Sequence, residues 1–170
     1  MAGATEALVV LARVRSGEAE AARAAIGAHW NAGESPFALV PGTHLGRLQV
    51  LTPPARRGRR RTREHVLLAA DADAPLDAWL ERLRRAAGAA LDAVLGHCAF
   101  YPGSAEAAIF ARWIAANRLE VGFSVIGSDA PLAEVSEALA LRDALGDFAE
   151  RTQRMGPAAL HEAWRVWRDA

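Results

Sequence analysis

The residues best suited to chemistry lie in one segment, residues 41–51, which reads Pro-Gly-Thr-His-Leu-Gly-Arg-Leu-Gln-Val-Leu. His44, Arg47 and Gln49 fall within six residues of a stretch that otherwise alternates like a strand. An imidazole titrates near neutral pH and can move a proton, and a guanidinium can hold an anionic oxygen. A strand that only fills a core has no need of these side chains. The segment therefore predicts a functional site, although it does not name a reaction.

A second segment, residues 96–102, reads Gly-His-Cys-Ala-Phe-Tyr-Pro and follows a predicted helix. His97 gains there from the negative end of the helix dipole, which is a sufficient structural reason for its presence. Cys98 continues the apolar stripe of the helix, so we interpret it as a buried side chain, with a thiolate nucleophile as the alternative. Tyr101 is expected to anchor the turn through its hydroxyl, with substrate binding as its other role. No second cysteine or spaced histidine pair completes a zinc site, so no metal is predicted.

The elements that must position these residues are strands and helices in mixed order. Ser16, Asp73, Ser104 and Asp129 are expected to cap helices. The order β-α-β-β-α-(α)-β-α predicts an α+β fold of the ferredoxin-like split βαβ type with a C-terminal helical extension. We expect one domain over residues 1–170, with its core at 6–128 and the extension at 129–170. The predicted strands cover 7–15, 43–51, 65–70 and 121–126, and the predicted helices run from Ser16 to about Trp30, from Asp73 through Leu95, from Ser104 past Ile114, from Pro131 to about Met155 and over 157–168.

Alternation along the strands sorts their side chains onto two faces of the sheet. One face is apolar and suits packing under the helices; its expected members include Val10, Val14, Leu48, Val50, Leu68 and Phe123. The other, the open face, is half polar and carries Arg13, Thr43, Arg47, Gln49, His65 and Asp71 among Leu11, Leu45 and Leu67. Such a face predicts either a ligand cavity enclosed by a dimer or a polar dimer interface without a ligand. A regular strand places His44 on the side opposite Arg47.

The two motifs and this element order resemble the dimeric α+β-barrel superfamily, in which two such sheets pack face to face. More narrowly, the chain is similar to bacterial proteins that pair a Pro-Gly-Thr-His-x-x-Arg strand with a Gly-His-Cys-x-x-Tyr-Pro turn. The resemblance covers about residues 6–128. It implies a homodimer, and it favours oxidative or cofactor-free proton-transfer chemistry over hydrolysis. The superfamily also contains haem enzymes and plain ligand binders, so membership alone does not choose the activity.

The leading interpretation is a small enzyme that binds a small, largely apolar organic molecule on the open face without a cofactor. Its expected catalytic residues are His44, Arg47 and His65, and its expected substrate-binding residues are Arg13, Gln49, Asp71 and Tyr101. One alternative is a non-catalytic binding or assembly protein whose open face only pairs subunits. Another is a haem protein acting with peroxide or oxygen, for which the available axial ligands are His44, His97, His161 and Cys98.

Composition excludes several other classes. The 20 basic residues, all arginine, balance 20 acidic ones, so no nucleic-acid partner is expected. The arginine-rich stretch 56–63 is interpreted as a solvated loop between two strands. No apolar run approaches the ~20 residues of a membrane span, and the start lacks signal-peptide features, so we expect no membrane partner and a cytoplasmic location. The lone cysteine fits a reducing compartment. Glycine-rich phosphate loops and hydrolase or metalloprotease motifs do not occur.

Overall fold

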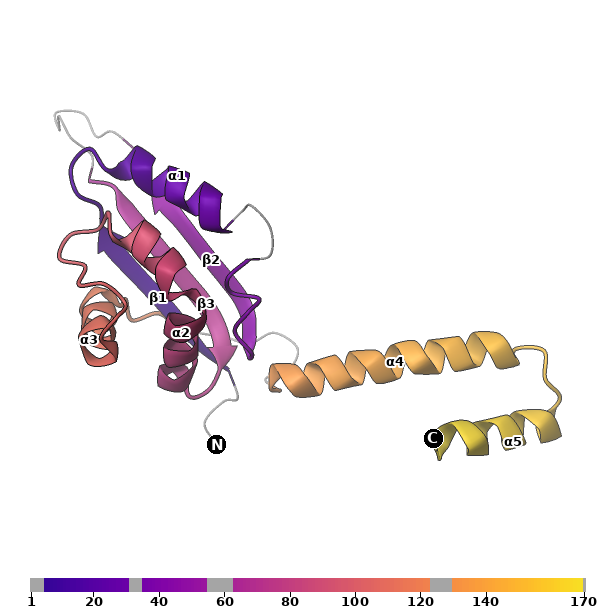
Figure 1. Ribbon diagram of the computed structural model, residues 1–170. Coiled ribbons are helices and arrows are strands. Elements are labelled where there is room, and N and C mark those ends of the chain that lie inside the picture. Colours follow the sequence, from indigo (N-terminus) through magenta and orange to yellow (C-terminus); the bar gives the residue numbers. More distant parts are fainter. Residues whose placement is uncertain (1–4, 31–34, 55–62, 123–129, 170) are drawn as a thin grey trace. The chain divides into compact units, whose positions relative to one another are not determined.

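The computed structural model describes residues 5–30, 35–54, 63–122 and 130–169. The chain divides into two compact units, Met1–Pro131 and Leu132–Ala170, which are treated separately below. Within the described residues the chain is an α+β protein with a three-stranded antiparallel sheet and five helices (Figure 1).

The sheet consists of β1 (Thr5–Arg13), β2 (Thr43–Leu51) and β3 (His65–Asp73), in the order β1-β3-β2. Both pairings are antiparallel, and Leu68 of β3 lies opposite Val10 on one side and Leu48 on the other. These three residues therefore share one face, as the alternation predicts. Val10 and Leu68 are fully buried there, whereas Leu48 is partly buried against the core.

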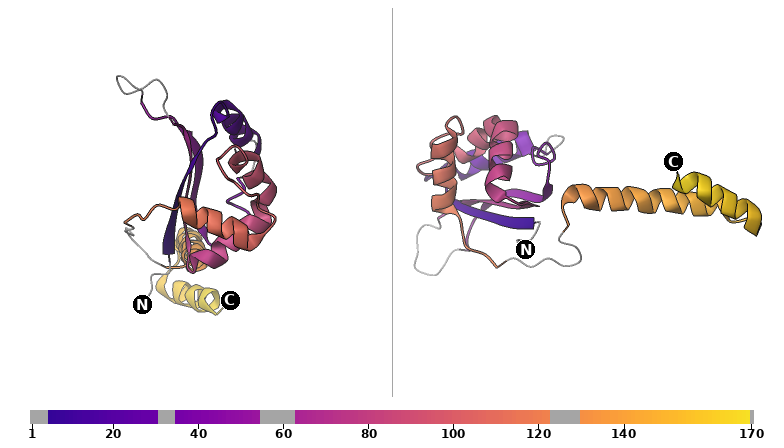
Figure 2. Two further views of the ribbon diagram at one scale, coloured as in Figure 1. Left: turned by 90° about the vertical axis from the view of Figure 1, so that its left-hand side faces the viewer. Right: turned by 90° about the horizontal axis from the view of Figure 1, so that it is seen from below.

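Three helices of the first unit lie on one side of the sheet, as the left view of Figure 2 shows. They are α1 (Ala19–Trp30), α2 (Leu76–Leu95) and α3 (Ala107–Asn117). The predicted stripe of α2 is buried throughout, because its apolar residues recur every three or four positions and face the sheet. Burial of each large apolar side chain stabilises the fold by roughly 1.5–3 kcal/mol. The spacing of Ile109, Phe110, Trp113 and Ile114 predicts one buried face of α3; the last three are buried, but Ile109 is 42% exposed.

The three expected helix caps that fall within the described residues are wrong, and the fourth, Asp129, lies outside those residues. The first helical hydrogen bond of α1 runs from the Ala22 N–H to the Glu18 carbonyl. The helix therefore begins after Glu18, and Ser16 is not its capping residue. The residues before α2 and α3 make no side-chain capping bond. The Asp73 carboxylate is bonded to a histidine instead, and Ser104 binds a carboxylate of α2. In both places a tertiary partner replaces the local backbone amides that a capping side chain would bind.

The predicted fourth strand, residues 121–126, lies mostly outside the described residues. Val121 and Gly122, the part that is described, are not in a strand, and Val121 is 43% exposed rather than buried. The chain nevertheless reaches the outer edge of β1 just after α3. The Leu119 N–H donates to the Val9 carbonyl at 2.8 Å, and Arg118 forms an isolated antiparallel bridge with Val10. Phe123, an expected core residue, falls outside the described ranges.

The second unit is a helical hairpin of α4 (Leu132–Thr152) and α5 (Pro157–Arg168). The tail helix has the predicted bounds, with proline in its first turn. Phe148 of α4 packs against Trp164 and Trp167 of α5, with ring centroids 5.6 and 5.5 Å away. No helix in the described part of the chain is long and apolar enough to cross a membrane.

Candidate functional site

The register of the strands fixes how side chains are arranged on the open face. Within the described residues, no helix of the first unit lies over this face (Figure 2). Side chains of β1, β3 and β2 line up in rows because paired residues of antiparallel strands point to the same side. The rows are Ala7–Asp71–Leu45, Val9–Ala69–Arg47, Leu11–Leu67–Gln49 and Arg13–His65–Leu51.

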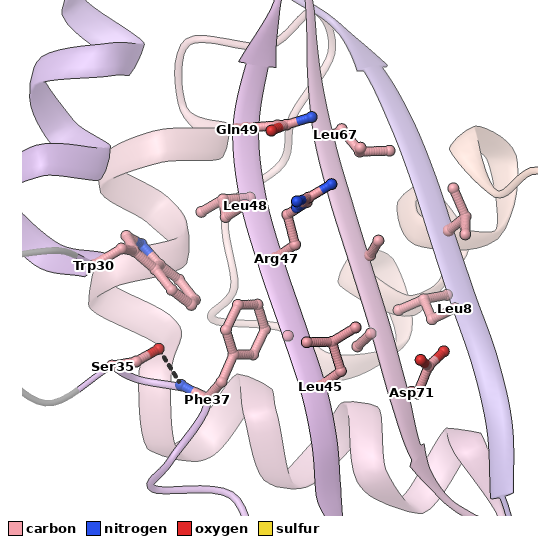
Figure 3. Close-up of a pocket in the computed structure, with 14 residues that line it drawn as sticks. Leu8, Trp30, Ser35, Phe37, Leu45, Arg47, Leu48, Gln49, Leu67 and Asp71 are labelled. Carbon is pink, nitrogen blue, oxygen red and sulfur yellow. Dashed lines mark hydrogen bonds between the residues drawn. The ribbon is translucent and has the colours of Figure 1, made fainter. Parts of the chain in front are cut away.

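A depression of about 630 Å³ lies over the middle of this face and around the edge of β2 that is turned away from β3. Its polar lining consists mainly of Arg47, Gln49 and Asp71, as Figure 3 shows. Its apolar lining on the open face is Val9, Leu45, Leu67 and Ala69. A concave apolar surface with a few polar groups is the usual composition of a small-molecule site.

Arg47 and Asp71 lie in neighbouring rows and on the same side of the sheet (Figure 3). Among the described residues neither side chain has a hydrogen bond or an ion pair with the other or with any further group. The same holds for the amide of Gln49. The depression therefore presents a cation, an anion and an amide whose bonding capacity is available to a ligand.

Around the edge of β2, the lining continues on the helix side of the strand with residues that the sequence analysis did not select. Trp30, at the end of α1, packs against Phe37 with ring centroids 4.6 Å apart (Figure 3). The Phe37 ring lies so close to Gly46 that a Cβ added there would meet it at 2.3 Å. A glycine inside a strand marks such a close approach, so Gly46 was the available signal for this contact.

His44 lies in a β-bulge at the start of β2. The pairing of β2 with β3 shifts between Thr43 and Leu45, so His44 falls outside the regular alternation of the strand. Its Nε2 lies 2.7 Å from Oδ1 of Asp73, at the end of β3. His44 does not line the depression.

Thr43 lies on the helix side of the sheet, not on the open face where a regular strand would place it. Its hydroxyl accepts a hydrogen bond from Trp79 Nε1 at 2.8 Å and donates to the Val40 carbonyl at 2.7 Å. The bulge at residue 44 reverses the alternation and so explains the difference.

His65 and Arg13 lie opposite each other at the other end of the sheet. Each is four residues along its strand from the row of Arg47, which corresponds to ~13 Å at ~3.3 Å per residue. His44 of β2 is bonded to Asp73 at one end of β3, whereas His65 is at the other end, eight residues away, which corresponds to roughly 26 Å by the same rise. The structure therefore does not bring the three expected catalytic residues together around one small substrate. It does bring Arg47, Gln49 and Asp71 together.

The Gly-His-Cys turn is also remote from the depression. His97 Nδ1 lies 2.7 Å from a Glu18 carboxylate oxygen, and this hydrogen bond lowers the pKa of Glu18. Cys98 is 2% exposed in the core, and burial raises the pKa of its thiol to about 12. This agrees with the interpretation of Cys98 as a buried side chain.

Tyr101 anchors its turn rather than a substrate. Its hydroxyl donates to Asp92 Oδ1 at 2.6 Å, and burial raises the pKa of the phenol. The same carboxylate accepts from the backbone N–H and the hydroxyl of Ser104 at 2.8 and 2.9 Å. Asp92, which the sequence analysis did not select, is thus the centre that fixes this turn to α2.

No cluster of three histidine, cysteine or acidic side chains that could hold a metal ion occurs among the described residues. Comparison with known protein families, with curated protein sequences and with solved structures finds no match for the chain. The relationship to the dimeric α+β-barrel superfamily therefore stays a prediction.

Proposed function

We propose that this chain binds a small, largely apolar organic anion on the open face of its sheet. The observation that carries the proposal is the depression beside Arg47, where a guanidinium without a partner among the described residues stands over an apolar floor. A carboxylate or enolate oxygen satisfies such a group through charge-assisted hydrogen bonds. The apolar remainder of the ligand then covers Leu45, Leu67 and Ala69.

We further propose that the protein is an enzyme of cofactor-free proton transfer, with Asp71 as the proton-accepting group. The sequence analysis gave this role to His44 or His65, but Asp71 is the titratable acid that lines the same depression as Arg47. A carboxylate within reach of a substrate carbon acid can act as general base, and a nearby guanidinium stabilises the enolate that forms. Without turnover, the same geometry supports the alternative of a ligand-binding protein.

The test uses phenylacetate as a probe in an NMR titration of the full chain. Binding is expected to shift the backbone amides of β2 and the side-chain amide of Gln49. Arg47→Gln should weaken the affinity about ten- to a hundredfold, because hydrogen bonds to charged groups are worth about 1.5–3 kcal/mol. Arg112→Gln, an exposed arginine of α3, is the matched control and should leave the affinity unchanged.

Two outcomes separate the parts of this proposal. If Arg47→Gln stays folded and binds phenylacetate as well as the wild type, the open-face site is wrong. If a screen of aryl and alkyl carbon acids finds turnover, Asp71→Asn should abolish it while retaining binding. Turnover that survives in Asp71→Asn contradicts the assignment of the base.

The ferredoxin-like topology and the dimer belong to the same proposal. The strand order β1-β3-β2, with antiparallel pairing, leaves the outer edge of β1 for a fourth strand, and the contacts of Arg118 and Leu119 with β1 support one there. A second copy placed on the open face would convert the depression into an enclosed cavity. Enclosure removes water and strengthens the attraction between Arg47 and an anion.

The haem alternative has weaker support from the described residues. Haem iron takes a thiolate or an imidazole as its axial ligand. Cys98 is buried in the core as a neutral thiol, and His97 is bonded to Glu18. A Soret band from the purified protein would favour haem over the anion site proposed here.

A further inference from the structure

A second depression lies at the opposite end of the sheet, beyond the row of Arg13 and His65. It encloses about 550 Å³ and is lined chiefly by polar groups. We call it the arginine pocket; its lining residues are Arg13, Val14, Arg15, Ser16, Gly17, Arg63 and Glu64. It shares no lining residue with the depression beside Arg47.

Three arginines bring positive charge to this pocket. Arg13 lies opposite His65 where β1 ends and β3 begins, and Arg15 and Arg63 lie two residues beyond these strand ends. All three line the pocket together with Glu64. Guanidinium groups gathered at one concave surface favour an anionic ligand.

The carboxylates nearest the pocket are already engaged. Glu64 accepts from Thr52 at 3.0 Å and pairs with Arg23 of α1 at 3.3 Å. Glu18 is bonded to His97 at 2.7 Å and lies 3.9 Å from the Arg15 guanidinium. These two glutamates already bind other groups. Among the described residues, much of the positive charge of the arginines in the pocket therefore has no counterion.

The three arginines differ in how they are held. Arg15 donates to the Gly96 carbonyl at 2.7 Å, which fixes its guanidinium beside the pocket. Arg13 and Arg63 are exposed and make no side-chain bond within the described part of the chain. Guanidinium groups bind phosphate oxygens through paired, charge-assisted hydrogen bonds, so two free ones beside a third suit a dianion better than a single carboxylate.

We propose that the arginine pocket binds the phosphoryl group of a small polar molecule, with Arg13 and Arg63 as its principal ligands. The volume exceeds that of a phosphate ion, and the polar lining suits a hydroxylated body better than an apolar one. The site does not depend on the function proposed for Arg47.

The test is calorimetric titration of the full chain with inorganic phosphate, pyrophosphate, ribose 5-phosphate and ribose. The three phosphates are expected to bind, with affinity that falls when the titration is repeated at higher salt, and ribose is not expected to bind. Weaker binding of ribose 5-phosphate than of inorganic phosphate would overturn the assignment to an ester. Arg13→Gln and Arg63→Gln should each weaken binding about tenfold, since each removes a charge-assisted interaction. Arg112→Gln is the matched control.

Folding and self-association are measured on the same variants. Arg13→Gln should melt no lower than the wild type without ligand, because the Arg13 side chain is exposed and makes no side-chain bond within the described part of the chain. Pyrophosphate should raise the melting temperature of the wild type more than that of Arg13→Gln. The proposal is overturned if no phosphate binds at millimolar concentration, if both variants bind like the wild type, or if they alter only the oligomeric state. Loss of phosphate binding leaves the phenylacetate test of Arg47 unaffected, so the two proposals fail separately.

Discussion

Arg47 and Arg13 are exposed arginines of the same sheet, and the side chains around them favour different ligands. Arg47 lies in a row with Val9 and Ala69, so a ligand that it binds also meets apolar surface. Arg13 lies in a row with His65 and beside two further arginines, so a ligand there meets charge. The same side chain therefore favours an apolar anion in one position and a polyanion in the other.

Cys98 offers a prediction about reactivity. Its thiol is buried with a pKa raised to about 12, so native protein at pH 8 should react with Ellman's reagent far more slowly than protein unfolded in guanidinium chloride. Labelling of native protein at the rate of an exposed thiol would contradict the buried position.

The same shift predicts a pH dependence of stability. The neutral thiol is favoured in the folded state, whereas in the unfolded chain it ionises above its ordinary pKa of about 8.5. The buried neutral thiol therefore contributes fully to the free energy of unfolding below about pH 8.5, and this contribution is lost as the pH rises towards 12. Urea melts of Cys98→Ala should lack this part of the alkaline decline that the wild type has.

At the level of the elements, β2 depends on a close contact at one glycine. A methyl group at Gly46 meets the Phe37 ring, so Gly46→Ala should destabilise the fold by about 1–3 kcal/mol through overpacking. Gly27→Ala is the matched control, because nothing lies within 4 Å of a Cβ at that position in α1. There the substitution should stabilise the helix by roughly 0.5–1 kcal/mol. Equal effects in urea melts would refute the contact.

The strands and the main helices were predictable because a single physical rule governs them. β2 and α5 have the bounds expected from the sequence, since alternation and helical spacing follow from burying one face. The errors lie where a tertiary partner changed a local preference. Asp73 bonds to His44 instead of capping a helix, and the bulge at His44 moves Thr43 to the helix side.

The site was predictable in part for the same reason. Alternation placed Arg47, Gln49 and Asp71 on one face, and all three line the depression. It gave no measure of distance along the strands, which requires the pairing register. The register separates Arg13 and His65 from Arg47.

At the level of the whole molecule, the open face predicts a homodimer. Light scattering at micromolar concentration should give twice the chain mass of 18.1 kDa, because the apolar side chains of this face are partly exposed in a single chain. Leu67→Glu, in the row of Leu11 and Gln49, should produce a monomer by placing a charge in the interface.

The control for this experiment comes from the helical hairpin, which also carries exposed apolar residues. Leu141 of α4 is 59% exposed, and Leu141→Glu should leave the mass of the dimer unchanged. A wild-type monomer contradicts the prediction. A Leu141→Glu monomer together with a dimeric Leu67→Glu would assign the interface to the hairpin instead.

The position of β2 at the edge of the sheet has a consequence for how the protein is handled. Among the described residues β2 pairs only with β3, so its other side offers backbone groups to which a strand of another molecule can add. The bulge at His44, the charge of Arg47 and the Pro53-Pro54 pair that follows β2 all oppose such addition. Replacing Arg47 by an apolar residue would remove one of these defences and promote aggregation. A polar replacement such as Arg47→Gln adds no apolar surface to this edge. A loss of binding in that variant can therefore be told apart from a loss of protein through aggregation.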